Sequence, residues 1–237
     1  MSVGRLVALI VVGTVCDGAQ ASREVIGHSS QGRPIVVERI GDPNGPRILV
    51  VGCIHGNECA GRAITTALRS SATPADVWIL PTINPDGALR GTRHNARGVD
   101  LNRNWSVRWR PAGRRWQTYY PGPRAWSEPE TRLARSLITR LRPQATIWYH
   151  QHLDLVWASG PSLRAGSVYA RAASISLLRR ASPAGAATAW QRHLMPRAAA
   201  FVVELPAGRL DGRAITRHVR AIADVAATRA GNQHGPS

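Results

Sequence analysis

A histidine and a glutamate three residues apart stand directly after an apolar run. The run covers residues 47–53 (RILVVGC), and His55 and Glu58 follow it. Neutral imidazole nitrogen and carboxylate oxygen both bind Zn²⁺ well, at about 2.0–2.2 Å. A helix capped by Asn57 and running to about Ser70 would bring both side chains to one point. A surface histidine beside a glutamate favoured at a helix start has the same spacing, so the pair alone leaves metal binding open.

A dense polar stretch follows a second apolar run, at residues 76–83. It contains Arg93 and the segment GVDLNRNW at residues 98–105. The planar guanidinium of Arg103 can hold a carboxylate through two hydrogen bonds, and Asn102 can add a donor. Asp100 can accept the N–H of a metal-bound histidine and so fix its tautomer. A solvated loop with an Arg–Asp surface pair is the alternative reading.

Two further candidates lie within apolar strands. Glu204 stands in AFVVEL, where a buried carboxylate costs several kcal/mol unless it is paired or protonated. A place beside a metal-bound water would remove that cost and make Glu204 a base, whereas a buried ion pair with an arginine is the alternative. His150 and His152 are two residues apart, so both project to one side of a strand and compete as a ligand. The context of His218 indicates only a surface or capping histidine.

The elements that must position these residues alternate along the chain. Strands are predicted at residues 34–40, 47–53, 76–83, 146–151 and 200–205, and helices at 57–70, 127–142, 169–180 and 212–230. The helix at 127–142 opens on a capping box formed by Ser127 and Glu130. The order predicts a single α/β domain with a parallel or mixed sheet covered by helices on both faces. Ligands bind beyond the carboxyl ends of the strands in such sheets.

Several motifs recur together in one order between about Val25 and Gly208. They are GCIHGNE, INPDG, RHNARGVDLNRNW, SEPET, IWYHQ and FVVELPAG. In this ordered set the chain resembles the zinc carboxypeptidase family, which includes pancreatic carboxypeptidases and bacterial murein peptide amidases. The resemblance implies a mixed, twisted β-sheet with helices on both faces and one Zn²⁺ per chain.

The resemblance assigns a role to each candidate. Its implied zinc ligands are His55, Glu58 and His150, with His150 favoured over His152 because the family's third ligand directly follows the apolar strand. Asp100 matches the carboxylate behind the first histidine, and Glu204 matches the general base. The implied substrate contacts are Arg93 on the oxyanion, Asn102 and Arg103 on a terminal carboxylate, and Thr188 near the position that sets side-chain preference.

These roles imply hydrolysis of a peptide bond next to a free carboxylate, by a zinc-activated water with Glu204 as base. Residues 182–190 lack the mobile tyrosine that pancreatic-type members carry over the cleft. Cell-wall peptides and ordinary peptides are both candidate substrates. A zinc-dependent deacylase of small N-acyl amino acids and an inactive cell-wall binding protein on the same fold are the alternatives.

The N-terminus and the composition bear on location and partners. Residues 1–21 read as a signal peptide, with Arg5, a short apolar run and the cleavage site Ala19-Gln20-Ala21, so residues 22–237 are expected as a secreted catalytic domain without stable membrane insertion. The chain has 31 basic residues, all arginine, and a net charge of +17. Such a surface suits an anionic cell wall, whereas scattered arginines without a motif argue against nucleic acid. Cys53 and Cys59 are either a disulfide or two buried thiols.

Overall fold

The computed structural model describes residues 22–230, and the predicted signal peptide at residues 1–21 lies outside them. Its strands are β1 (Ser22–His28), β2 (Pro34–Gly41), β3 (Arg47–Val51), β4 (Asp76–Leu80), β5 (Ala145–Ala158), β6 (Ser176–Arg179) and β7 (Ala199–Pro206). Its α-helices are α1 (Gly61–Leu68), α2 (Pro85–Arg90), α3 (Pro129–Leu141), α4 (Leu163–Ala173), α5 (Ala187–Leu194) and α6 (Gly212–Ala230).

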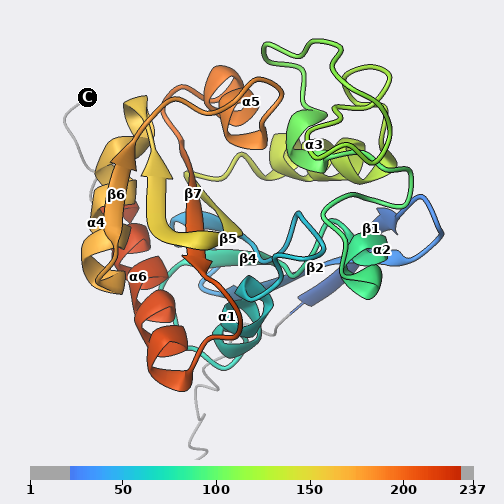
Figure 1. Ribbon diagram of the computed structural model, residues 1–237. Helices are drawn as coiled ribbons and strands as arrows, with labels where there is room; N and C mark the ends of the chain where they lie inside the picture. The colour runs from blue at the N-terminus through green and yellow to red at the C-terminus, as the bar shows by residue number, and fades with distance from the viewer. Residues whose placement is uncertain (1–21, 231–237) are drawn as a thin grey trace, which may run out of the picture.

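All these strands join one mixed sheet (Figure 1). The order is β1-β2-β4-β3-β5-β6, and β7 also pairs with β5. The pairs β3–β4, β3–β5, β5–β6 and β5–β7 are parallel, whereas β1 and β2 form an antiparallel edge. The predicted fold class, an α/β domain with a mixed sheet, is therefore confirmed.

Alternate residues of β3 supply the two faces of the core. Ile48 and Val50 pack in a cluster with residues of α1, α4 and α6. Leu49 and Val51 pack on the opposite face with residues of α3 and α5. Side chains of a strand alternate between faces, so a run that is apolar throughout requires helices on both sides. This packing holds the carboxyl ends of β3, β5 and β7 rigidly at one edge.

Two predicted helices have the wrong boundaries. Helix α1 begins at Gly61 rather than after Asn57, because residues 55–60 form a turn in which the Glu58 amide donates to His55 O at 2.9 Å. The predicted helix at 169–180 is α4, which begins earlier, at Leu163, and ends at Ala173; Ser174 is its C-cap, with a φ of +58°, and the strand β6 follows. The left-handed residue breaks the helix and frees the next segment to pair with β5.

The predicted capping box is also wrong. Helix α3 begins at Pro129, with Glu128 as an extended N-cap that makes no side-chain capping bond. A proline restricts the residue before it to extended backbone, which moves the helix start past Ser127. Glu130 instead accepts a hydrogen bond from the Ser30 amide at 2.8 Å and holds the N-terminal loop.

One strand and one histidine also differ from the prediction. The strand expected at 146–151 continues to Ala158, where it pairs with β6. His218 is buried rather than exposed, and its Nδ1 lies 2.8 Å from the Tyr169 hydroxyl. Among the residues that the structure describes, no helix has the length and apolar content needed to cross a bilayer.

Candidate active site

The three predicted metal ligands meet at the carboxyl end of the sheet. His55 lies in the turn after β3, Glu58 lies before α1, and His150 lies in β5. Glu58 Oε2 is 2.8 Å from His55 Nδ1 and 2.9 Å from His150 Nδ1. One ligand atom from each residue lies within 4.8 Å of the other two. A neutral imidazole pair and one carboxylate, converging from separate elements, fit a Zn²⁺ ion that keeps a position open for substrate.

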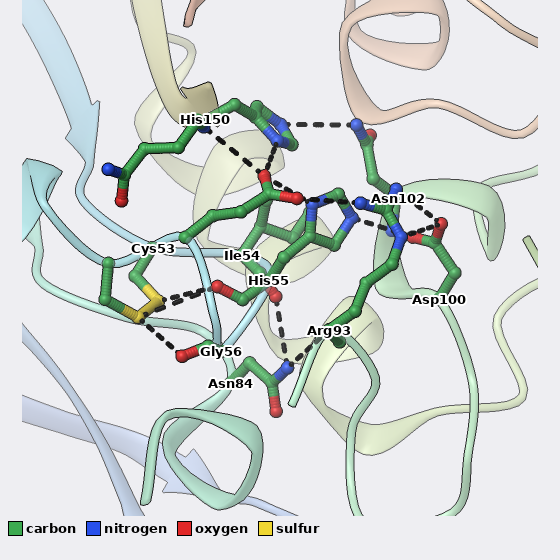
Figure 2. A network of polar contacts seen from close by, with 12 residues as sticks. Cys53, Ile54, His55, Gly56, Asn84, Arg93, Asp100, Asn102 and His150 are labelled. Atoms are coloured by element: carbon green, nitrogen blue, oxygen red, sulfur yellow. Dashed lines mark hydrogen bonds and ion pairs between the residues drawn. A yellow bond between two sulfur atoms is a disulfide. The ribbon is translucent and has the colours of Figure 1, made fainter. Parts of the chain in front are cut away.

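The second nitrogen of His55 is held by Asp100. His55 Nε2 is 2.9 Å from Asp100 Oδ1, and both side chains are buried (Figure 2). This contact leaves Nδ1 as the nitrogen that faces Glu58, which is the tautomer a metal ligand needs. Burial opposes protonation of His55, yet the Asp100 and Glu58 carboxylates outweigh it and raise the pKa of His55. Burial likewise opposes ionisation of Asp100, but His55 and Arg93 hold its pKa well below the usual range.

A disulfide between Cys53 and Cys59 closes the loop that carries His55 and Glu58. The loop is also attached to β5, because Gln151 Oε1 accepts a hydrogen bond from the Ala60 amide at 3.0 Å. Cross-linking a six-residue separation removes freedom from the ligand loop. Of the two states left open by the sequence, the structure has the disulfide.

Glu204 lies beside His150 in the sheet. The two residues are register partners in the parallel pair β5–β7, so their side chains emerge on one side. Glu204 is 9% exposed, and its Oε2 has no hydrogen-bond partner among the described residues. The alternative of a buried ion pair with an arginine is not observed within residues 22–230. Burial raises the pKa of Glu204, and the nearby His150 only partly opposes this.

The same cleft contains both histidines of β5. It encloses about 310 Å³, and His150, His152 and Glu204 all line it. His150 contacts Glu58, whereas His152 is absent from the cluster of ligand atoms. The geometry therefore favours His150 as the third ligand and leaves His152 as part of the cleft wall.

Arg93 and Asn102 make contacts with neighbouring residues that the sequence did not indicate. Arg93 donates to Glu58 Oε1 at 2.7 Å and to Asp100 Oδ2 at 2.9 Å, so its guanidinium is held by two ion pairs at the cleft wall. Asn102 Oδ1 accepts from the Ala187 amide at 3.0 Å, so Asn102 positions α5. Asn102 also lines the cleft, and its Nδ2 lies 3.3 Å from His150 Nε2 (Figure 2).

Arg103 keeps its guanidinium available. It donates to Asn102 O at 2.8 Å and pairs with no carboxylate in the described part of the chain. Burial lowers the pKa of Arg103, opposed mainly by Asp100. Its Cζ lies 4.9 Å from the ring centre of Tyr119, and the Arg93 Cζ lies 5.4 Å from the same ring. Tyr119 was not predicted from the sequence, although aromatic residues interleaved with arginines at 105–126 were a usable signal.

Thr188 lines the cleft and has a partner that the sequence did not suggest. Its Oγ1 is 2.8 Å from Ser182 Oγ, and both residues line the cleft. Ser182 comes from the loop before α5, and Thr188 comes from the first turn of that helix. The two hydroxyls form a polar part of the cleft wall.

The sequence matches the family model described as zinc carboxypeptidase over residues 18–161. The chain belongs to the zinc carboxypeptidase family. The matched segment includes His55, Glu58 and His150, and these donors stand together in the structure, which confirms the predicted zinc cofactor. Glu204 and Thr188 lie beyond the match, so their roles stay predictions that rest on geometry.

Individual relatives belong to two groups. Murein peptide amidase A of Escherichia coli (strain K12) is 32% identical over 127 residues, which is 46% of this chain and 50% of the relative. Carboxypeptidase B of Astacus astacus is 29% identical over 168 residues, which is 57% of this chain and 55% of the relative. The chain thus spans about half the length of the curated relatives it matches.

Two solved structures share the fold of this chain. The murein-tripeptide amidase from Escherichia coli O157 aligns with a TM-score of 0.69 at 25% identity, covering 86% of this chain and 91% of that one. Thrombin-activatable fibrinolysis inhibitor aligns with a TM-score of 0.75 at 18% identity, covering 90% of this chain and 70% of that one. The second likeness shows the fold alone.

Proposed function

We propose that the protein is a zinc-dependent hydrolase that cleaves a peptide bond next to a free carboxylate, with Glu204 as general base. One observation carries the proposal: the unpartnered Oε2 of Glu204 shares a cleft with the three converging donors His55, Glu58 and His150. A structural carboxylate in a strand would have a hydrogen-bond partner or an ion pair. A base waiting for a substrate proton does not need one.

Two residues of the cleft contribute to orientation: Arg103 orients the substrate, and Asn102 positions helix α5. Arg103 holds the free carboxylate of the substrate, because it lines the cleft and forms no ion pair with a carboxylate within residues 22–230. Asn102 keeps α5 in place and borders the same pocket. Fixing the carboxylate sets the scissile carbonyl near the metal donors, which lowers the entropic part of the barrier.

The proton moves through Glu204. His55, Glu58 and His150 would hold a zinc ion, which would supply a Lewis acid able to lower the pKa of water towards about 7. Glu204 Oε2 accepts the proton from the attacking water and delivers it to the leaving amine nitrogen. Arg93, kept in position by Glu58 and Asp100, places a positive charge at the cleft wall for the developing oxyanion.

We further propose secretion and a cell-wall peptide as the natural substrate. The signal-like segment at residues 1–21 supports export. The relatives named murein peptide amidase and the aligned murein-tripeptide amidase support a cell-wall peptide. The net charge of +17 would concentrate the enzyme on an anionic wall.

Hydrolysis of a small panel tests the function. The panel holds blocked dipeptides with free C-termini, their C-terminal amides, a cell-wall tripeptide containing diaminopimelate, and an N-acyl amino acid. We expect chelator-sensitive cleavage of free-carboxylate peptides and little cleavage of the matching amides. Cleavage of only the N-acyl amino acid would favour the deacylase. Zinc binding without any turnover would favour the inactive binding protein.

A further inference from the structure

The cleft wall formed by Ser182 and Thr188 is backed by arginines. Arg192, on α5, donates to Ser182 Oγ at 3.4 Å and to Ser159 O at 3.0 Å. Arg108, in the loop after η1 (Leu101–Arg103), donates to Ser182 O. Two guanidinium groups from distant segments therefore converge on one serine that lines the cleft.

These two arginines lack an acidic partner. Within residues 22–230, neither forms an ion pair with a carboxylate. Arg192 is half-buried, and its buried Nε has no hydrogen-bond partner among the residues that the structure describes. Burial and the nearby Arg108 both lower the pKa of Arg192. A partly desolvated cation beside a second cation is costly, and a bound anion would relieve that cost.

Outside the reaction centre, the described cleft lining has no carboxylate that could bind a basic side chain. Glu58 and Glu204 are the carboxylates among the residues that line the cleft, and both belong to the reaction centre. A basic side chain on the substrate would therefore meet hydroxyls and guanidinium groups. A side-chain carboxylate would instead accept hydrogen bonds from Ser182 and Thr188, with the arginine charge behind them.

We propose that this wall selects substrates whose C-terminal residue carries a side-chain carboxylate, with Arg192 and Arg108 as specificity-determining residues. The inference rests on the proposed peptide hydrolysis and adds the substrate class to it. The free α-carboxylate binds at Arg103, and the side-chain carboxylate binds at Ser182 and Thr188. Substrates ending in lysine or arginine are disfavoured because nothing at this wall neutralises them.

Four blocked dipeptides that differ only in the C-terminal residue test the inference on the zinc-loaded enzyme. With glutamate, glutamine, leucine and lysine in that position, we expect kcat/KM to be about tenfold higher for glutamate than for glutamine, and lowest for lysine. The Glu/Gln pair has nearly the same shape, so its ratio isolates charge. Hydrolysis of these peptides with leucine or lysine equal to or better than glutamate overturns the inference and leaves the proposed function standing. No hydrolysis of any of them, together with no hydrolysis of the cell-wall tripeptide, overturns the function itself.

Variants assign the selectivity to the two arginines. We expect the Glu/Gln ratio to fall at least about fivefold in Arg192→Gln and to fall in Arg108→Gln. The ratio is internal to each preparation, so partial misfolding does not mimic the effect, and the exposed position of Arg108 protects the second variant from misfolding. Arg213→Gln removes the same charge from an exposed site on α6 and should keep the wild-type ratio. A ratio unchanged in both Arg192→Gln and Arg108→Gln excludes these residues.

Discussion

Asp100 contacts both a metal ligand, His55, and a residue of the cleft wall, Arg93. One of its oxygens faces His55 Nε2 and the Asn102 amide, and the other accepts two hydrogen bonds from Arg93. The carboxylate is fully buried, so its charge is balanced by these neighbours and by nearby Arg103 rather than by solvent. Loss of that charge should disturb His55 before anything else, since His55 Nε2 has no other partner within residues 22–230.

We therefore expect Asp100→Asn to weaken zinc binding by about 10- to 100-fold. Competition with a chromogenic chelator measures the affinity directly. Asp224→Asn, on the outer helix α6, removes an equal charge away from the site and should bind zinc like the wild type. Equal zinc affinity in Asp100→Asn and the wild type would show that Asp100 does not orient His55.

Tyr119 packs against both cleft arginines while remaining 60% exposed. Removing the ring in Tyr119→Ala should free the guanidinium groups to move and raise KM about threefold to tenfold, with a smaller change in kcat. Tyr119→Phe keeps the ring and should restore most of the affinity. Trp116→Ala, on the same loop and similarly exposed, is the matched control. An unchanged KM in Tyr119→Ala would mean that the ring does not order the arginines.

The metal donors and Asp100 behind His55 were predictable, but most of their other contacts were not. The ligand set came from the ordered motifs shared with the zinc carboxypeptidase family, because the spacing of His55 and Glu58 alone left metal binding open. The ion pair between Arg93 and Glu58 was not predictable, because the two residues are 35 positions apart and only the folded loops bring them together. The lack of a hydrogen-bond partner at Glu204 Oε2 within residues 22–230 was not predictable either, since it can be recognised only when the position of every neighbouring side chain is known.

Elements were predicted well where hydrophobic runs dominate and poorly where a single residue decides a boundary. Helix α6 matches its prediction at Gly212–Ala230, because its apolar residues repeat at helical spacing over 19 residues. Pro129 and Ser174 moved the ends of α3 and α4 through local backbone geometry. The prediction ended this strand at residue 151, whereas β5 continues to Ala158. The polar residues Gln151, His152 and Asp154 follow the apolar run and resemble a strand end.

A row of buried, hydrogen-bonded side chains joins β5, α4 and α6. Tyr149 of β5 contacts the Tyr169 hydroxyl of α4 at 2.6 Å, and that hydroxyl contacts His218 of α6 at 2.8 Å. Burial lowers the pKa of His218 from 6.5 to about 4. His218 therefore stays neutral in the folded state at a pH where the unfolded chain already takes up a proton.

The folded protein should lose stability as pH falls through this interval. Above pH 6.5 the histidine is neutral in both states and has no effect, and the loss is complete near pH 4. Between pH 7 and pH 5 it amounts to about 2 kcal/mol of unfolding free energy. His218→Gln should show a correspondingly smaller drop in urea unfolding, while the exposed His193→Gln should behave as the wild type. Identical pH slopes for His218→Gln and the wild type would contradict this assignment.

The molecule as a whole should fold without its metal and be stabilised by it. Two hydrophobic clusters hold the sheet from both faces. The three donors also hydrogen-bond to one another, since Glu58 lies between both imidazoles. The disulfide closes the loop that carries two of them.

We expect chelator-treated protein to keep its circular-dichroism spectrum while its Tm falls. Zinc at about 1,000 times its Kd adds about 4 kcal/mol of stability. For a domain of this size, that should restore roughly 8–16 °C of Tm. Mg²⁺ at the same concentration should give no comparable shift, because two imidazoles suit zinc and not magnesium. An unchanged Tm on adding zinc would contradict a zinc site at these donors.

The most direct test compares the Glu204→Gln variant with the wild type, by zinc content and by hydrolysis of a blocked dipeptide with a free carboxylate. Glu204 is not among the three donors, so the variant should still bind one zinc per chain. Its kcat should fall by about 10²- to 10⁴-fold, because glutamine cannot take the proton from water. A zinc-loaded variant with kcat within tenfold of the wild type would contradict the account.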